Sequence, residues 1–514
     1  MPRRRFLLTA ESATIDRALA ELRAELEIRE DFPSDVLAQA QDAAAQGLPA
    51  PGSLPEHGRP SIAPVDMREL PFVTVDPPSS MDLDQAAYLT RGSDAGEAGY
   101  TIYYAIACLA FMVRPGGPLD TEVRERGTSI YGPGHVIALH PEAISADAAS
   151  LLPGEDRLAY VWQIGLDAEG AMTSYSVRPA LVRSRAKLSY TDVQRALDGA
   201  GELEGEVPAD FPQLLERIGQ LRIAREAARG GVSLDIPEQE VAESPDGYVL
   251  SYRANLPVES YNAQLSLATG IAAARIMRRA GTGILRTLPP AEERDLRRLR
   301  HTARALGLSW PSEMTYQDFV RSLSSADAAA AAFLNEATTL FRGSGYLAFA
   351  GGAILGEDGE ATEPLGESHP HAAIAAEYAH VTAPLRRLVD RYGLEICAAA
   401  CAGEPIAPWA VEGLAGLPAI MARTSQLASR YERRAIDLVE AAVLSSHIGE
   451  TFSATVIDAR NGGGTVLLRT PAVRGRVAGD LAPGTRVTVR VRAADPTTGT
   501  IELDVVDADA GGEH

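Results

Sequence analysis

Three carboxylates lie within nine positions in the segment Thr74-Val-Asp76-Pro-Pro-Ser-Ser-Met-Asp82-Leu-Asp84-Gln85. A short β-like run leads into the Pro-Pro turn, so the acids are expected on a tight loop. Carboxylates held this close repel one another unless a cation lies between them, and Mg²⁺ prefers oxygen ligands. From the residues alone, a metal site at Asp76, Asp82 and Asp84 and a solvated acidic turn are equally favoured.

A cationic segment, Thr382-Ala-Pro384-Leu-Arg386-Arg387, offers a possible partner for phosphate. Thr382 is a good N-cap and Pro384 suits a first turn, so the segment predicts a helix with Arg386 near its N-terminus. Backbone N–H groups and a guanidinium there both favour phosphate. The alternative is a surface Arg386 paired with Asp390 four residues on, worth a few tenths of a kcal/mol. The residues alone favour this alternative.

Tyr131 is a candidate for contact with an unpaired base. It follows a strand-like segment and precedes Gly132-Pro133-Gly134, which places its ring at the edge of a loop. Aromatic faces stack on unpaired bases for roughly 1–3 kcal/mol each. For a single Tyr, half-buried packing is the commoner role, and it stays open as the alternative.

Three motifs, in this order, resemble those of the RNase II/RNB exoribonucleases. They are Asp76-Pro-Pro-x-x-x-Asp82-Leu-Asp84, the run from Leu119 through Arg126 and Tyr131 to Gly134, and the run from Tyr378 through Arg386 and Arg387 to Asp390. Members of this family enclose a channel for single-stranded RNA and hydrolyse it from the 3′ end with Mg²⁺. The resemblance therefore implies a Mg²⁺-dependent 3′→5′ exoribonuclease that releases nucleoside 5′-monophosphates.

The resemblance also assigns roles around the acids. It implies that Asp76, Asp82 and Asp84 hold the metal, with Asp82 and Asp84 also catalytic. Gln85 lies where the family usually has a fourth Asp. Its amide can still offer an oxygen to a metal, but one negative charge is lost. Arg386 would stabilise the transition state, and Arg387 would be a supporting phosphate contact.

Further family positions concern the RNA. Tyr131 would clamp the 3′-terminal nucleotides, and Glu432 would line the end of the active site, although a solvated helix face is nearly as favoured for Glu432. A Glu pair that touches the ribose is replaced by Asn262-Ala-Gln264, and an amide such as Gln264 can still hydrogen-bond a 2′-OH. A family His-Ile-Ala-Asp is replaced by a run ending at Cys108, which loses an acid.

The elements that must position these residues fall into three parts, giving a multi-domain α+β fold. Residues 1–58 predict a small helical N-terminal domain, with a winged-helix-like arrangement as one option, helices at 13–29 and 35–46, and Ser34 as an N-cap. Residues 59–446 predict a large RNB-like catalytic domain. Its β-like runs are 72–75, 100–106 and 158–164, and its amphipathic stretches are 213–229, 258–280, 315–341, 385–402 and 411–446.

Residues 447–508 predict an S1-like barrel of the OB fold, and 509–514 a tail. The five β-like runs are 452–457, 465–469, 475–477, 486–492 and 500–506. In the fourth run Arg486, Arg490 and Arg492 alternate with Val, so they share one strand face. Arg490 and Arg492 are candidates for RNA binding, and cross-strand pairing with Glu502 and Asp504 is equally favoured.

Composition limits the classes of protein that are possible. The net charge of −21 excludes a surface coated in positive charge, but not RNA in an interior channel. No apolar run is long enough for a membrane span, and the N-terminal apolar stretch is too short for a signal peptide, so a cytoplasmic monomer without membrane contact is expected. The cysteines, Cys108, Cys397 and Cys401, are expected to be packed thiols.

Two rival functions remain. One is a metal phosphoesterase acting on small nucleotides, which the terminal barrel and the long channel domain argue against. The other is a catalytically degenerate RNB-type RNA-binding protein, in which Gln85 and Cys108 mark lost catalysis. Retention of Asp84 together with Arg386 argues against decay.

Overall fold

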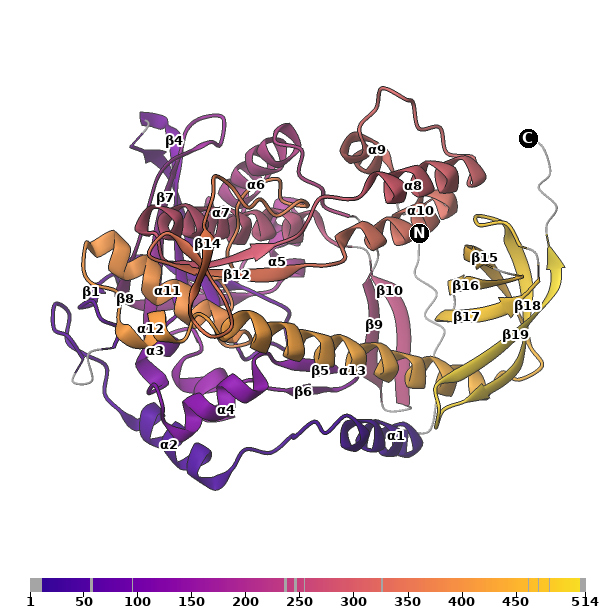
Figure 1. Cartoon of the computed structure of the whole chain (residues 1–514), viewed down its shortest axis with the longest axis horizontal. Coiled ribbons are helices and arrows are strands. Elements are labelled where there is room, and N and C mark those ends of the chain that lie inside the picture. The colour runs from indigo at the N-terminus through magenta and orange to yellow at the C-terminus, as the bar shows by residue number, and fades with distance from the viewer. Residues whose placement is uncertain are drawn as a thin grey trace.

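The computed structural model describes residues 12–55, 59–94, 96–234, 238–244, 247–253, 255–324, 327–460, 462–469, 471–479 and 481–508. Two helices are followed by a mixed α/β body and then by a closed barrel, which confirms the multi-domain α+β class. Figure 1 shows the body and the barrel at opposite ends of the long axis, with the long helix α13 (Leu417–Ser445) running between them. Within the described residues, no helix combines the length and the apolar character needed to span a bilayer.

One sheet forms the centre of the body. Its strands are β1 (Val65–Asp66), β2 (Phe72–Val75), β3 (Gln85–Ser93), β4 (Gly96–Ala107), β7 (Asp156–Leu166) and β8 (Met172–Leu188), in the order β1-β8-β2-β3-β4-β7. β8 also pairs with β7, so this one long strand joins the two sides of the sheet. All four residues of β2 are buried, as expected for β-branched and aromatic side chains in a central strand.

Helices cover this sheet and fill the core. They include α5 (Tyr190–Leu197), α6 (Phe211–Ala228), α7 (Pro257–Ala280) and α11 (Leu388–Ala402). α7 packs against both α6 and α11. It begins at Pro257, whose fixed φ suits a first turn, and ends before Gly281, which adopts the left-handed conformation at φ 67°. α7 therefore connects the sheet with the segment that carries Arg386.

Short elements complete the body. They are α3 (Leu109–Met112), α4 (Pro118–Arg126), β5 (Ile130–Gly132), β6 (His135–Ile137), a π-helix at Ala143–Ala148, β9 (Glu238–Ser244), β10 (Gly247–Arg253), β11 (Gly283–Thr287), β12 (Gly345–Ala350), β13 (Ala353–Leu355), β14 (Ala361–Pro364) and α12 (Pro408–Glu412). β5 and β6 form a hairpin, and β11 to β14 form an antiparallel sheet in chain order.

Two of the predicted helical stretches are broken in the structure. The stretch 315–341 divides into α9 (Tyr316–Ser322), α10 (Ala328–Ala337) and a 3₁₀ turn at Thr338–Phe341. Together with α8 (Glu293–Ala305), these elements pack around Trp310, whose ring stacks on Phe319 at 4.6 Å. The stretch 411–446 divides into α12 and α13, and α13 begins with Pro418 in its first turn.

The two N-terminal helices form as predicted but do not share a core. α1 (Ser12–Glu25) packs on α13, and its apolar side chains belong to the same cluster as the barrel interior. α2 (Ser34–Ala45) packs on α4 and on the π-helix of the body. The N-cap prediction for Ser34 is wrong, because Ser34 is the first helical residue and Pro33 occupies the cap. The domain limits at 58 and 446 stay predictions, and the predicted tail 509–514 lies outside the described residues.

The last part of the described chain is the predicted five-stranded barrel. Its strands are β15 (Thr451–Arg460), β16 (Gly463–Arg469), β17 (Ala472–Ala478), β18 (Arg486–Asp495) and β19 (Thr500–Ala508), closed in the order β15-β16-β17-β19-β18. Val487, Val489 and Val491 point into the barrel core, while Arg490 and Arg492 are exposed. The alternation in the sequence therefore predicts the two faces of this strand correctly.

The cysteines correct one expectation. Cys108 and Cys397 are buried thiols, as predicted, whereas Cys401 is exposed. None of the three forms a disulfide. Burial raises the pKa of the Cys397 thiol well above its ordinary value, so this residue is held as an inert, packed group.

Candidate active site

The acidic loop starts and ends on paired strands. Asp76 follows β2 directly and Asp84 immediately precedes β3, and these strands are antiparallel neighbours with Val73 opposite Ala87. The chain therefore returns to its starting point, and the carboxylates are gathered at one end of the sheet. This arrangement follows from the local sequence, in which a buried strand is ended by two prolines.

Lys187 fixes this loop from the neighbouring strand β8. Its ammonium group donates hydrogen bonds to the carbonyl oxygens of Pro78 at 2.9 Å and Ser80 at 2.5 Å. Lys187 is the only Lys in the chain. The sequence motifs assign no role to it. Its being the only Lys in a chain that otherwise uses Arg could have marked it as a candidate functional residue.

Asp84 is the most deeply buried of the three acids, at 6% exposure. Its Oδ1 accepts the backbone N–H of Leu385 at 2.8 Å, and its Oδ2 lies 3.7 Å from Nε of Arg386. Burial raises the pKa of Asp84 well above its ordinary value, and Arg386 and the Leu385 N–H offset this only in part. The charged form of Asp84 therefore depends on the cation next to it.

The charge of Asp76 is also only partly compensated, by Arg386 and Lys187. Burial, and then the nearby charge of Asp82, raise its pKa to about 6. Its Oδ2 is buried and has no hydrogen-bond partner among the described groups. A carboxylate oxygen in this state is short of a cation or a donor. Asp76 and Asp82 thus form an acidic pair whose negative charge Arg386 and Lys187 offset only in part.

These acids fit a divalent cation of the kind that binds together with its substrate. Within the described residues, no group of three or more His, Cys, Asp or Glu side chains is arranged so that it could hold a metal ion. Mg²⁺, however, is usually held by one or two carboxylates with several waters and the phosphates of a substrate. The unpartnered Oδ2 of Asp76 and the adjacent Asp82 match that donor set.

Gln85 uses both ends of its amide within the protein. Its Nε2 donates to the carbonyl oxygen of Thr382 at 2.6 Å. Its Oε1 accepts from the hydroxyl of Tyr104 and, at 3.4 Å, from that of Ser266, and these two hydroxyls lie 2.9 Å apart. Gln85 therefore links the acidic loop to β4, to α7 and to the segment before Arg386. A metal would have to compete with two hydroxyl donors for its oxygen.

The segment around Arg386 differs from the predicted helix start. α11 begins only at Leu388, with Arg387 as its N-cap residue, so neither Thr382 as an N-cap nor Pro384 in the first turn is correct. The reason is tertiary: the buried carboxylate of Asp390 accepts the backbone N–H of Ala383 at 2.7 Å and holds the preceding residues in a turn. Arg386 lies on this turn and is 45% exposed.

The two arginines have different partners. Nε and a terminal nitrogen of Arg387 each donate to the fully buried Asp390 at 2.8 Å. The expected pairing of Arg386 with Asp390 is therefore wrong, because Arg387 takes that carboxylate. Arg386 faces Asp84 instead. The guanidinium of Arg387 is already held in a bidentate pair with Asp390. Its role as a phosphate contact stays a prediction.

Tyr131 lies beside the acids and Arg386. It is the middle residue of β5 and is 39% exposed. Burial raises the pKa of its hydroxyl, the nearby Arg386 lowers that pKa, and the charges of Asp82 and Asp84 raise it. The carbonyl oxygen of Arg386 also accepts hydrogen bonds from the chain next to β5, at Ser129 N–H and the Thr128 hydroxyl. Residues far apart in the sequence thus meet in one site.

The two remaining predicted residues lie in different surroundings. Glu432, on α13, accepts the backbone N–H of Tyr131, and burial raises the pKa of its carboxyl. Gln264 is buried on the face of α7 that packs on α6, where its amide donates to Glu226 at 2.5 Å. Its Oε1 has no hydrogen-bond partner among the described residues, and Gln264 lines a cavity of about 410 Å³. It is Ser266, two residues on, that reaches the Gln85 network.

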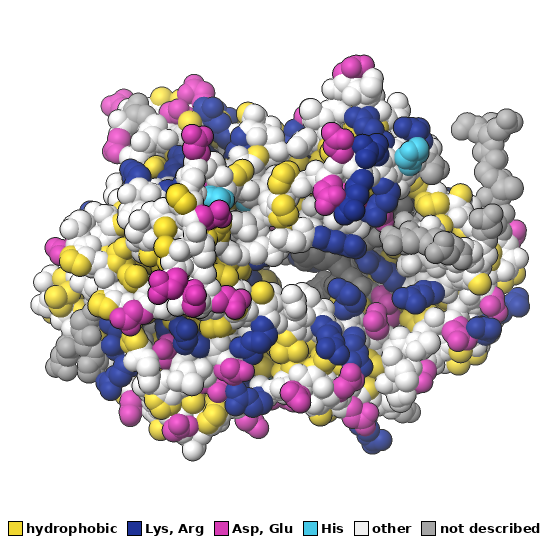
Figure 2. Space-filling model, viewed as in Figure 1, with side chains coloured by type: hydrophobic (Ala, Val, Ile, Leu, Met, Phe, Trp, Pro, Cys, Tyr) yellow, Lys and Arg dark blue, Asp and Glu magenta, His cyan; other side chains and the backbone are white. Residues whose placement is uncertain are grey.

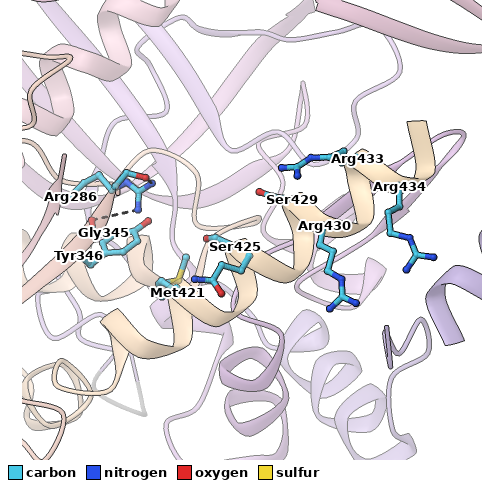
Figure 3. Close-up of a pocket in the computed structure, with 12 residues that line it drawn as sticks. Arg286, Gly345, Tyr346, Met421, Ser425, Ser429, Arg430, Arg433 and Arg434 are labelled. Carbon is cyan, nitrogen blue, oxygen red and sulfur yellow. Dashed lines mark hydrogen bonds between the residues drawn. The ribbon is translucent and has the colours of Figure 1, made fainter. Parts of the chain in front are cut away.

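A larger pocket, of about 660 Å³, lies between α13 and the start of β12. Figure 3 shows Arg286 and Tyr346 on one side and Ser429, Arg430 and Arg433 along α13, with Arg433 directed toward the side of Arg286. The described residues that line it include no Asp or Glu. Figure 2 shows Lys and Arg side chains gathered around an opening above α13. A cationic hollow on a chain of net charge −21 suits a polyanion.

This pocket and Tyr131 share one turn of α13. Ser429 and Arg433 line the pocket, and Glu432, between them, accepts the Tyr131 N–H. Arg286 is held in place by hydrogen bonds to Ser344 and Gly345 and lies 4.7 Å from the centroid of the Tyr346 ring. The pocket and the site around Tyr131 are therefore linked through α13, although neither the acids nor Arg386 line the pocket.

In the barrel, the arginine face carries both charges. Arg492 pairs with Glu502 at 2.7 Å and lies 3.9 Å from Asp504, so the predicted cross-strand alternative holds for this residue. Arg490 is exposed and lies opposite Asp504 in the β18–β19 register. RNA binding by Arg490 and Arg492 stays a prediction.

The sequence is similar to proteins named Ribonuclease R. It is 37% identical to the Escherichia coli protein over 177 residues, covering 34% of this chain and 21% of that protein. It is 26% identical to the Aquifex aeolicus protein over 401 residues, covering 75% of this chain and 54% of that protein. The chain thus matches from about a fifth to about half of the length of these relatives.

Solved structures share the fold. Mycoplasma genitalium RNase R in complex with ribose methylated single-stranded RNA matches with a TM-score of 0.81 at 19% identity, over 96% of this chain and 78% of that one. Yeast Ssd1, described as a pseudonuclease, matches with a TM-score of 0.67 at 13% identity, over 93% of this chain and 58% of that one. The fold therefore occurs in a nuclease and in a pseudonuclease.

Two family models match the chain in the order that the sequence motifs indicate. The RNB domain covers residues 65–400, and the RNase II-type exonuclease C-terminal S1 domain covers residues 450–506. The first match includes the acidic loop, Tyr131 and Arg386, and the second coincides with the five-stranded barrel. On the matched length and the shared architecture, the chain belongs to the RNB family and ends in an S1 domain of the RNase II type.

Proposed function

We propose that the protein is a hydrolytic 3′→5′ exoribonuclease that degrades single-stranded RNA to nucleoside 5′-monophosphates with Mg²⁺. The observation that carries the proposal is the convergence of Asp76, Asp82 and Asp84 with Arg386 and Tyr131 at one end of the body sheet. Acids whose charge is only partly compensated suit a metal, a half-exposed guanidinium suits a phosphate, and an exposed ring suits a base.

Asp76 and Asp82 would hold the cation. Asp84, which is buried and faces Arg386, would add a third carboxylate to the site. Mg²⁺ bound there would lower the pKa of an attacking water and stabilise the oxygens of an in-line displacement. Arg386, which is 45% exposed and faces Asp84, can turn its free N–H donors toward the phosphate that is cleaved. The Leu385 N–H orients the Asp84 carboxylate, so the anion and the cation are fixed on adjacent residues of one turn.

The RNA would reach this site along the cationic pocket on α13. Arg430 and Arg433 would contact its phosphates, and Tyr131 would stack on bases near the 3′ end. An RNase R of known structure is described in complex with single-stranded RNA, and another structure of it with double-stranded RNA. A polymer path of this kind argues against small nucleotides as substrates.

A degenerate RNA-binding protein is the second candidate. Gln85 favours it, because the residue in the position of a family acid has both ends of its amide hydrogen-bonded within the protein. The similarity to the pseudonuclease Ssd1 points the same way. Against it stand the unpartnered Asp76 and the Asp84–Arg386 pair, both of which a binding protein could lose.

A time course on 5′-labelled single-stranded RNA separates the two candidates. With Mg²⁺, the nuclease produces a ladder that shortens from the 3′ end, and EDTA stops it. RNA that is bound but stays at full length with Mg²⁺ would support the degenerate binder. That the protein acts as a monomer in the cytoplasm also stays a proposal, which size-exclusion chromatography and cell fractionation test.

A further inference from the structure

The segment that carries α1 and the chain after it lies outside both matched family regions. In Figure 1 α1 lies below α13 and the β5–β6 hairpin, well apart from α2. We propose that Glu30, just after α1, positions Tyr131 by fixing the turn of that hairpin, and so sets where the ring of Tyr131 holds the 3′ end of the RNA. The effect on RNA rests on the proposed function, whereas the positioning of the hairpin by Glu30 does not.

The hairpin needs support from outside itself. β5 and β6 have only three residues each, and a two-stranded hairpin of this size is marginally stable alone. Ile130 and Ile137, which pair across it, are buried in the same cluster as the apolar side chains of α1. Those side chains are Ile15, Ala18, Leu19, Leu22 and Leu26. The hairpin and α1 are therefore joined in one buried cluster through α13, which packs on both α1 and β5.

A closed ring of contacts then fixes the turn next to Tyr131. Glu30 accepts from Nε of Arg23 at 2.6 Å and pairs with Nε2 of His135 at 3.2 Å. Arg23 also donates to the hydroxyl of Tyr431 at 3.3 Å. The Tyr431 ring lies against Gly132, where an added Cβ would be 2.8 Å from a ring carbon. Gly132 pairs with His135 across the hairpin, which closes the ring.

The Glu30 carboxylate thus contacts one end of the turn directly, through His135, and the other end indirectly, through Arg23 and the Tyr431 ring. Gly132 directly follows Tyr131, so a shift of this turn moves the ring of Tyr131. The backbone N–H of Tyr131 is held separately by Glu432, which leaves the tilt of the hairpin to be set by the Glu30 ring. Side chains as exposed as Glu30 and His135, at 40% and 47%, contribute little to overall stability. Their contribution is to fix the position of the hairpin turn.

The test compares Glu30→Ala with Glu25→Ala in the full-length protein. Glu25 makes a bidentate pair with Arg434, at 2.5 and 2.8 Å, which also joins α1 to α13 but belongs to the helices alone. Glu30→Ala should change the length of the shortest RNA product by about one nucleotide or more, as Tyr131→Ala should, because the stacking position moves. Glu25→Ala should leave the product as in wild type. Glu30→Gln, which keeps one acceptor oxygen for Nε of Arg23 and can donate its NH₂ to a neutral His135 Nε2, should restore it.

A second measurement needs no RNA. Hydrogen exchange of the amides in residues 130–137 should become about two- to fivefold faster in Glu30→Ala, the range expected for loss of one exposed ion pair, and should not change in Glu25→Ala. Unchanged exchange would overturn the proposal, whether or not the protein is a nuclease. So would a wild-type product length in Glu30→Ala when Tyr131→Ala alters it. Failure of wild type to degrade RNA would instead contradict the proposed function.

Discussion

Asp84 and Arg386 face each other across the site, with 3.7 Å between Oδ2 of the first and Nε of the second. The residue next to Arg386, Leu385, donates its backbone N–H to the other oxygen of the same carboxylate. One turn of chain therefore presents both a fixed donor and a positive charge to Asp84. Because Arg387 takes Asp390, that carboxylate does not occupy Arg386, whose guanidinium lies beside Asp84 and Tyr131.

Arg386→Ala should lower single-turnover cleavage by at least about a hundredfold, by analogy with loss of one oxyanion donor. Its melting temperature should change little, because the side chain is 45% exposed. Arg386→Lys should rescue poorly, since a point charge lacks the bidentate fork.

The neighbouring arginine provides the contrast for this test. Arg387→Ala leaves the buried Asp390 without its bidentate partner. The melting temperature of this variant should therefore fall, while its single-turnover cleavage rate should change less than that of Arg386→Ala. Asp390→Ala should destabilise the protein as well, because Asp390 also holds the turn through Ala383. An Arg386→Ala protein that cleaves near the parental rate would remove the best non-metal catalytic residue.

The pKa of Asp76 gives a prediction for the metal-free protein. Because the folded-state pKa is about 6 and the ordinary value is 3.8, the folded state binds more protons between these values, and stability falls as pH rises through that window. Asp76→Asn, which cannot ionise, should therefore be more stable than wild type above pH 6 by about 2–3 kcal/mol. The difference should fall to about half a kcal/mol near pH 4. Thermal unfolding in EDTA at both pH values measures it.

The same variant should lose the response to Mg²⁺. Wild type should gain melting temperature with added Mg²⁺ above pH 6, where Asp76 is ionised and can bind the cation. Asp76→Asn should gain less and should cleave RNA poorly. If Mg²⁺ stabilises both proteins equally, Asp76 is not a metal ligand.

Tyr131→Ala should leave Mg²⁺ stabilisation intact and change the length of the final undegraded oligonucleotide, because the ring is proposed to hold the last bases by stacking. Gel analysis of exhaustive digests beside wild type measures this. An end product identical to that of wild type would return Tyr131 to a packing role.

The barrel is best tested by point changes, because its interior shares a cluster with α1 and α13 and its deletion would expose them. Arg490→Ala with Arg492→Ala should weaken RNA binding and reduce the slope of log affinity against log salt by about 0.7 for each phosphate that these arginines neutralise in wild type. Cleavage at saturating RNA should remain. Arg183→Ala, which breaks an ion pair with Asp156 in the body, is the control. Equal salt slopes in all three proteins would make the barrel arginines partners of Glu502 and Asp504 only.

Local patterns predicted much of the fold correctly. The strand at 72–75 and the five barrel strands followed from alternation and turn residues, and α7 from apolar spacing. The start of α11 could not be predicted this way, because a buried carboxylate seven residues downstream, Asp390, caps the turn at Ala383. Local signals at Thr382 and Pro384 are overridden by that tertiary contact.

The site shows the same division. The acids, Arg386 and Tyr131 were found from motifs, and the structure brings them together. The direction of Gln264 was not predictable, because it depends on which face of α7 packs on α6. Nor were the hydroxyl partners of Gln85, since Tyr104 and Ser266 approach it from other elements. Contacts between distant elements produce no pattern in the local sequence, so these contacts could not be predicted from it.

The most direct measurement is single-turnover cleavage and binding of 5′-labelled single-stranded RNA by wild type and Asp84→Asn in excess Mg²⁺. Asn can still accept the Leu385 N–H, so the turn that carries Arg386 should keep its shape. Loss of one carboxylate also relieves repulsion of the RNA phosphates. Asp84→Asn should therefore bind RNA at least as tightly as wild type and leave it uncut, while wild type shortens it from the 3′ end. Cleavage by Asp84→Asn at the wild-type rate would contradict the assignment of this acidic loop as the catalytic site.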